Sequence, residues 1–334
     1  MNDAMSPAHP VPTLSVVICA YTLDRWDDLR AAIASVLAQK SPPDEVVLVI
    51  DHCQVLYERA SKMWPAVTVV PSRGPRGLSA ARNTGVSVSQ GDVVAFLDDD
   101  AAAEPEWTAR LLAHYADPRV AGVGGLVRPR WSTRRPVWFP PEFDWVVGCS
   151  YRGLPERTAA VRNFIGANMS FRRTELLAVG GFLGTLGRVG DRPTAGCEET
   201  ELCLRIASRR PDAILLYEPD AEVRHRVPEA RTSWSYFRSR CYGEGLSKAL
   251  VARYDGSGPA LASERAYLKS TIPRALARNL RRTGRPGALR TLGALSAGVC
   301  VTGTGYLAGR LRAPGPGRFA WHPPVSVQAL WDGP

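Results

Sequence analysis

Three consecutive aspartates, Asp98, Asp99 and Asp100, follow the apolar stretch 93–97. Carboxylates repel one another, and aspartate is unfavourable in strands, so this triplet calls for a positive partner or full solvation. Mg²⁺ and Mn²⁺ bind a few carboxylates and complete their coordination with water and phosphate oxygens. No lysine or arginine adjoins the triplet in the sequence. The aspartate triplet therefore predicts a site for a metal ion that carries a diphosphate; the alternative is an ordinary solvated turn.

Polar residues also follow two other expected strands. Tyr21 and Thr22 come at the end of the apolar stretch 14–21, and Asp51 follows the stretch 45–50. Ligands of open α/β sheets bind outside the carboxyl ends of the strands, so these residues are expected at one rim with the aspartates. In segment 76–85, Arg82 and Asn83 offer a guanidinium and an amide to the same phosphates.

Alternating strands and helices are expected to position these groups. Apolar and amphipathic patterns predict strands at 14–21, 45–50, 66–71 and 93–97 and helices at 25–39, 57–64 and 77–90. This order predicts right-handed crossovers and an α/β fold with a mainly parallel sheet covered on both faces. Further on, the sequence predicts a strand at 120–129, a Trp- and Pro-rich loop at 130–145, a strand followed by a helix within 163–182, and a helix at 197–210.

The composition indicates a globular protein with a cationic C-terminal region. The 334 residues are 45% hydrophobic and 22% charged. Seven scattered cysteines without a CxxC pair argue against a disulfide framework or zinc site and for a reducing cytosol, and the N-terminus has no signal-peptide pattern. The formal net charge is +10, and residues 265–331 hold eleven Lys and Arg and no Asp or Glu. A cationic region of this kind is typical of segments that bind nucleic acid or anionic lipid.

Five motifs occur in the order of the family 2 glycosyltransferases, which have the GT-A fold. They are VVICAYTLDRWDDL, GLSAARNTG, GDVVAFLDDDAAAEPEW, GANMSFRR and GCEETELCLRI. The resemblance covers residues 13–250, with a nucleotide-sugar-binding half at 13–110 and an acceptor half at 111–250. It implies a metal-dependent, inverting transfer from a nucleotide-diphospho-sugar, with UDP as the first expectation, to a glycan, lipid-linked or small-molecule hydroxyl.

The resemblance also assigns residues to the donor site. Asp98 and Asp100 match the metal-binding DxD acids, and Asp51 matches the acid that holds the nucleotide base. Asp51 begins the sequence DHCQ, where the family more often has Asp-(Asp/Asn)-Gly-Ser. His225 is a further expected ligand of Mg²⁺ or Mn²⁺, with a purely structural histidine as the alternative. The other residues expected at the nucleotide-sugar are Tyr21, Thr22, Arg25, Arg82, Asn83 and Asp99.

Glu198 and Glu199 match the Glu-Asp motif of the family, whose second acid serves as the general base. A base is needed because the acceptor hydroxyl loses its proton as it attacks an oxocarbenium-like centre. We expect the helix N-terminus to keep Glu199 ionised; a solvated first turn is the alternative. Gly166, Asn168 and Arg238 are expected at the acceptor or transferred sugar. Arg240 and Lys248 on the same helix could, with Arg238, close over the phosphates or meet the acceptor; a solvated basic face is equally consistent with the sequence.

Residues 251–312 are expected to form a basic, partly apolar helical extension, between the domain and a Pro/Gly-rich tail at 313–334. Residues 291–309 carry no charge and are nearly long enough to span a bilayer. Their five glycines make the segment only weakly apolar, which argues against a membrane-spanning helix. Eight basic residues at 265–290 lie among Leu, Ile and Ala, a pattern typical of helices on anionic lipid. We expect a cytoplasmic protein attached to the inner face of the membrane; a helical pair packed on the domain is the alternative.

Other functional classes fit the sequence less well. A retaining glycosyltransferase or a nucleotidyltransferase could use the same fold, but the acids at 198–199 and the GANMSFRR segment favour the inverting family. A cationic membrane-surface or nucleic-acid-binding protein would not need acids at strand ends, and we expect no nucleic-acid partner. No GxGxxG follows the first strand, which argues against a dinucleotide-binding enzyme.

Overall fold

The structure of the protein is a computed structural model that describes residues 11–184, 197–254, 262–281, 283–284 and 287–312. The tail at 313–334 and all but the last two residues of the expected flexible N-terminus, 1–12, lie outside the described residues.

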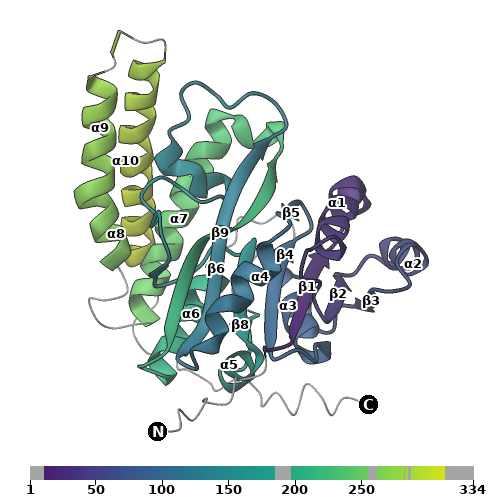
Figure 1. The fold of residues 1–334 in the computed structure, drawn as a ribbon. Coiled ribbons are helices and arrows are strands. Elements are labelled where there is room, and N and C mark those ends of the chain that lie inside the picture. The colour runs from purple at the N-terminus through teal and green to yellow at the C-terminus, as the bar shows by residue number, and fades with distance from the viewer. Residues whose placement is uncertain (1–10, 185–196, 255–261, 282, 285–286, 313–334) are drawn as a thin grey trace, which may run out of the picture.

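A nine-stranded sheet runs through the molecule (Figure 1). Its order is β3-β2-β1-β4-β8-β6-β9-β5, and β7 pairs with β9. The strands are β1 (Leu14–Ala20), β2 (Glu45–Ile50), β3 (Thr68–Pro71), β4 (Val93–Asp98), β5 (Ala101–Ala103), β6 (Val120–Trp131), β7 (Ala159–Ala160), β8 (Asn168–Arg172) and β9 (Ile214–Val227).

The sheet confirms the α/β fold class, and its two parts differ in direction. Strands β3, β2, β1 and β4 are parallel, as the alternating strands and helices predicted. β8 runs antiparallel to both β4 and β6, β5 runs antiparallel to β9, and β6 and β9 are parallel. Because β1, β2 and β4 are parallel neighbours, their carboxyl ends lie at one rim of the sheet.

The helices cover both faces of this sheet. The main ones before residue 230 are α1 (Trp26–Leu37), α2 (Gln54–Met63), α3 (Leu78–Val88), α4 (Trp107–Leu112), α5 (Arg173–Ala178) and α6 (Glu198–Arg209). Short 3₁₀ turns are η1 (Leu23–Arg25), η2 (Ala113–Ala116), η3 (Pro141–Val147) and η4 (Glu229–Thr232). The predicted helix at 197–210 agrees with α6, and the predicted loop at 130–145 instead ends in η3.

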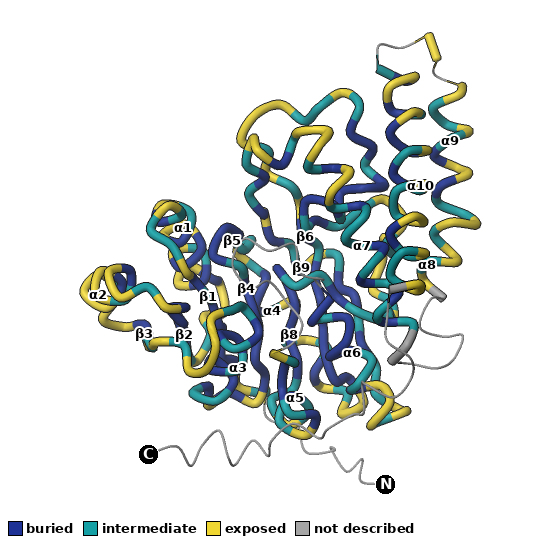
Figure 2. The backbone as a smooth tube through the Cα atoms, turned by 180° about the vertical axis from the view of Figure 1, so that it is seen from behind, coloured by how far each residue is buried: buried dark blue, intermediate teal, exposed yellow. Residues whose placement is uncertain are grey.

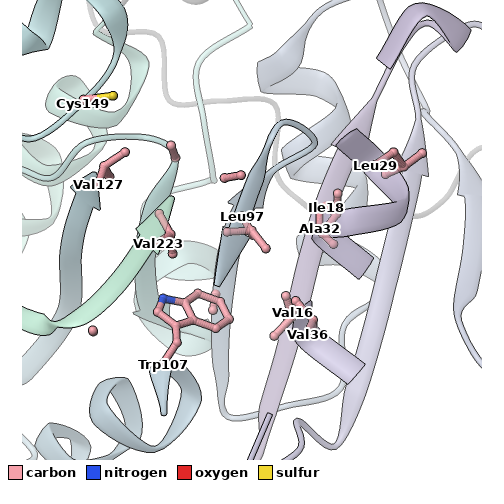
Figure 3. Close-up of a cluster of buried hydrophobic side chains, with 14 of the residues drawn as sticks. Val16, Ile18, Leu29, Ala32, Val36, Leu97, Trp107, Val127, Cys149 and Val223 are labelled. Carbon is pink, nitrogen blue, oxygen red and sulfur yellow. The ribbon is translucent and has the colours of Figure 1, made fainter. Parts of the chain in front are cut away.

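Apolar side chains of α1 and β1 form one part of the core (Figure 3). Leu29, Ala32 and Val36 recur at helical spacing on α1 and pack toward Val16 and Ile18 of β1. On the other face, Gly85 lets α3 approach the sheet, because a Cβ there would lie 2.3 Å from a methyl carbon of Val17. The strands and helices that hold the rim residues are therefore fixed by close packing.

The C-terminal extension packs on the domain as a set of helices. Its helices are α8 (Ala262–Ala266), the π-helical turn η6 (Tyr267–Thr271), α9 (Ile272–Leu280) and α10 (Ala288–Arg312), and they follow α7 (Trp234–Tyr254), most of which lies within the expected domain. α9 and α10 form a hairpin at one side of the molecule, with α7 between the hairpin and the sheet (Figure 1). The packed helical pair, one of the two alternatives from the sequence, is thus what the structure contains.

The glycines of α7 and α10 allow close packing of these two helices. A Cβ at Gly305 would lie 2.2 Å from the carbonyl oxygen of Tyr242, and one at Gly245 would lie 2.1 Å from that of Thr302. Small residues let the backbones of α7 and α10 approach this closely. Within the described residues one helix, Ala288–Leu311, is long and apolar enough to cross a membrane, and 22% of its most apolar window is buried.

Candidate active site

Two aspartates and a histidine converge at the rim of the sheet. β4 ends at Asp98, and Asp100 lies in the turn that leads into β5. The antiparallel pairing of β5 with β9 places His225 beside this turn. The ligand atoms of Asp98, Asp100 and His225 all lie within 4.8 Å of one another, and His225 Nε2 is 3.1 Å from Asp100 Oδ1. Two carboxylates and an imidazole form a donor set that suits Mn²⁺ or Mg²⁺.

The acids have a cationic neighbour that the local sequence did not show. Arg25 Nη1 lies 2.8 Å from Asp99 Oδ1 and 3.1 Å from Asp100 Oδ2. The same guanidinium lies over the Tyr21 ring, 5.3 Å from its centroid. Arg25, predicted at the nucleotide-sugar, thus pairs with the aspartates. The absence of adjacent basic residues in the sequence did not mean their absence in space.

Burial and these charges move the two carboxyl pKa values apart. Burial raises the pKa of Asp99 to about 7 against the opposing charge of Arg25. Burial also disfavours ionisation of Asp100, but the hydrogen bond and charge of His225, together with Arg25, hold its pKa well below the usual range. Asp100 is therefore the ionised carboxylate at the centre of the group.

Asp51 directly follows β2 at the same rim, with β1 between β2 and β4, the strand that leads into the aspartates. Its carboxylate accepts hydrogen bonds from the Gly77 backbone N–H, at 3.0 Å, and contacts His52 Nδ1 at 2.7 Å. Tyr21, Arg25 and Asp51 line the same cavity as the three aspartates. The structure thus brings most of the predicted donor-site residues together.

Arg82 lies behind the rim and joins three segments. Its guanidinium lies 3.1 Å from Glu198 Oε1 and 3.5 Å from Asp98 Oδ1, and it donates to the Gly166 carbonyl oxygen at 3.1 Å. Arg82 is 2% exposed. These ion pairs connect α3 to β4 and to the start of α6, and Arg82 also lines the cavity, so its phosphate contact stays a prediction.

Glu199 faces the cavity one residue after the ion-paired Glu198. Burial, and next the neighbouring Glu198 carboxylate, raise the pKa of Glu199 to about 8. The expectation that the helix N-terminus keeps Glu199 ionised is therefore wrong at neutral pH, because desolvation exceeds the effect of the helix dipole. A pKa near 8 suits a group that accepts a proton in the reaction.

Several predicted residues do not reach the cavity. Asn83 exchanges hydrogen bonds with the Phe182 backbone at 2.7 and 2.8 Å. Asn168 accepts from Trp107 Nε1 at 2.8 Å and donates to the Leu126 and Ala221 carbonyl oxygens. Thr22 caps η1, and Arg238 is exposed on α7. Asn83 and Asn168 instead bind backbone groups of neighbouring segments and so stabilise the surroundings of the site.

A cavity of about 1080 Å³ contains these groups and extends to the C-terminal helices. Ligand sites usually measure roughly 300–1,000 Å³, so this cavity has room for more than one small molecule. Its other wall is supplied by α7, α8, η6 and α10; the sequence pointed to Arg240 and Lys248 of α7 but not to the residues of α8, η6 and α10. The lining residues on these elements include Arg240, Glu244, Lys248, Glu264, Tyr267, Leu268, Val299, Gly303 and Tyr306.

The curled mixed sheet, the Asp-x-Asp turn and the rim cavity define a glycosyltransferase of the GT-A fold. A mannosyltransferase of Pyrobaculum calidifontis, solved with GDP-Man and Mn²⁺, is similar with a TM-score of 0.59 and 19% identity, covering 89% of this chain and 87% of its own. GalNAc-T7, solved with UDP, GalNAc and Mn²⁺, gives a TM-score of 0.50 and 17% identity over 78% and 55% of the two chains.

The chain belongs to glycosyl transferase family 2, whose family model matches residues 15–177. A glucosyl-dolichyl phosphate glucuronosyltransferase of Haloferax volcanii is 37% identical over 242 residues, 71% of this chain and 77% of the relative. A pre-mycofactocin glycosyltransferase of Mycobacterium tuberculosis is 29% identical over 193 residues, 58% of this chain and 38% of the relative. The protein is therefore a hexosyltransferase with a metal-binding Asp-x-Asp site.

Loss of one metal ligand should be visible in direct binding. Asp100→Asn should weaken Mn²⁺ binding at least about tenfold in the presence of UDP, because it removes a carboxylate ligand. Isothermal titration calorimetry measures the affinity, and circular dichroism checks the fold. Asp27→Asn on α1, whose side chain is 92% exposed, is the matched control. An unchanged Mn²⁺ affinity in Asp100→Asn would contradict the assignment.

Proposed function

We propose that the protein transfers a sugar from a nucleotide-diphospho-sugar to a hydroxyl group, with inversion at the anomeric carbon. The observation that carries this proposal is one cavity that contains both the Asp98–Asp100–His225 group and Glu199. A metal ion at the first group would neutralise the diphosphate as it leaves. Glu199 would act on the acceptor within the same cavity.

The donor side of the cavity fits a nucleoside diphosphate. Asp51 at the end of β2 would hold the base, and Asp98, Asp100 and His225 would hold Mn²⁺ or Mg²⁺. Arg25, already paired with Asp99 and Asp100, keeps this group of acids from repelling the phosphates. A UDP-sugar is our first choice of donor; a GDP-sugar is the competing choice, since one similar structure contains GDP-Man.

The acceptor side fits removal of a proton by Glu199. Glu198 is paired with Arg82, and Glu244 and Glu264 with Lys248, whereas Glu199 lines the cavity without an ion pair among the described residues. Deprotonation of the attacking hydroxyl by a positioned carboxylate would make a direct displacement at the anomeric carbon possible. Direct displacement inverts the configuration, which distinguishes this proposal from a retaining mechanism.

Replacement of the base should abolish turnover without loss of donor binding. Glu199→Gln should slow Mn²⁺-dependent hydrolysis of UDP-sugars roughly 10²–10⁴-fold, while UDP affinity stays unchanged. In the unsubstituted protein the hydrolysis rate should rise with pH and level off above about 8, because only ionised Glu199 accepts a proton. The exposed Glu229→Gln is the control. Normal hydrolysis by Glu199→Gln, or a rate that falls between pH 6 and 8, contradicts the role.

We also propose a cytoplasmic location at the inner face of the membrane, with the α9–α10 hairpin against anionic lipid. Leu280, Leu289, Leu307 and Leu311 are between 59% and 85% exposed on these helices. The outward side of the hairpin includes exposed residues along its length (Figure 2). Exposed arginines lie among these leucines at 274, 281 and 290. The name of the Haloferax volcanii relative, which includes a dolichyl phosphate, agrees with such a location.

Vesicle binding tests the location. The protein should sediment with vesicles that contain phosphatidylglycerol and be released by high salt. The triple substitution of Arg274, Arg281 and Arg290 by Gln should abolish sedimentation, because each arginine contributes about 1 kcal/mol to adsorption. A charge-matched triple substitution at the exposed Arg30, Arg110 and Arg209 is the control. Equal sedimentation of the two triple variants would refute a role of the hairpin.

A further inference from the structure

The cavity has a second arm that the donor-site residues do not fill. This arm lies between α7, α10 and the α8–η6 segment, away from the ends of β1, β2 and β4. Arg240 and Lys248 line it from α7, Gly303 and Tyr306 from α10, and Leu268 from η6. The donor site and this arm belong to one cavity, which Glu199 also lines.

Arg240 in this arm has no anionic partner within the part of the chain that the structure describes. Its buried Nε makes no hydrogen bond, and none of the described residues forms an ion pair with its guanidinium. Glu244, one helical turn later, is not available, because it pairs with Lys248 at 3.0 Å. Lys248 in turn pairs with Glu264 at 2.7 Å. A partly buried guanidinium without an acid is a site for a ligand anion, and phosphate matches its geometry.

The arm also has an apolar stripe on α10 and η6, among polar lining residues that include Arg265, Ser270 and Thr302. Val299, Gly303 and Tyr306 recur at helical spacing on one side of α10 and face the cavity. Tyr267 and Leu268 of η6 line it as well. Leu268 is 50% exposed, so the arm opens to solvent at this end. An anion site next to an open apolar channel fits a ligand with a phosphate head and a hydrocarbon chain.

We propose that this arm binds the lipid part of the acceptor, a saccharide linked to a polyprenyl phosphate, with Arg240 at the phosphate and the first isoprene units along α10. This inference rests on the proposed function, since it names the class of acceptor for the same site. With the exposed leucines and arginines of α9 and α10 against the lipid, the remaining chain would pass into the membrane.

A matched pair of glycines tests the channel. A Cβ at Gly303 or at Gly293 meets no atom within 4 Å, so leucine fits at either position of α10, but Gly303 alone lines the cavity. Gly303→Leu should bind farnesyl phosphate at least about tenfold more weakly than Gly293→Leu does. Both variants should unfold at or above the temperature of the parent, because leucine favours helix more than glycine.

The phosphate contact is tested with the same probe. Arg240→Gln should weaken binding of farnesyl phosphate about tenfold or more and leave the weaker binding of farnesol unchanged. Arg240→Lys should restore part of the affinity. The exposed Arg209→Gln is the charge-matched control. Fluorescence of the native tryptophans or calorimetry measures each affinity.

UDP binding with Mn²⁺, measured on the same proteins, separates the two proposals. Normal UDP binding together with selective loss of farnesyl phosphate in Gly303→Leu and Arg240→Gln supports the acceptor site. Normal UDP binding with no farnesyl phosphate binding to the parent, or with equal binding to all variants, overturns the acceptor site and leaves the donor proposal intact. Failure of the parent to bind UDP overturns the donor proposal itself.

Discussion

A buried guanidinium is stable only when its charge is paired and its N–H groups are hydrogen-bonded, and Arg82 meets this condition by joining the two halves of the site. It pairs with Glu198 and Asp98 and donates to the Gly166 carbonyl oxygen. Gly85 places α3 close enough to β1 for this reach. The metal-binding turn and the helix that carries Glu199 are therefore held by one side chain.

Much of the donor site followed from local sequence. Apolar runs located β1, β2 and β4, and parallel pairing then placed Asp51 and Asp98 at one rim. The roles of Asn83, Asn168 and Arg82 could not be read in this way. Each depends on partners between 42 and 116 positions away, such as Phe182, Trp107 and Glu198. Spacing predicts which face of a helix or strand a residue occupies, but not which distant segment packs against that face.

The C-terminal helices show the same limit more clearly. Their charge and apolar stretches indicated a surface role, whereas the close contact of α10 with α7 depends on glycines at 245 and 305 whose neighbours appear only in the fold. With α10 in this position, Gly303 and Tyr306 become part of the cavity wall. The extension thus forms one wall of the cavity and also presents leucines and arginines to the outside.

The coupling through Arg82 is tested most directly by a double-mutant cycle between Arg82 and Glu198, in which the free energy of unfolding is measured. Arg82→Met leaves the Glu198 carboxylate buried without its partner, and Glu198→Leu removes the shortest ion pair of Arg82; each loss of a buried partner costs about 3–5 kcal/mol. We predict that the double variant costs at least about 2 kcal/mol less than the sum of the two single variants. Costs that add to within about 0.5 kcal/mol would show that Arg82 does not couple the metal-binding turn to the helix of Glu199.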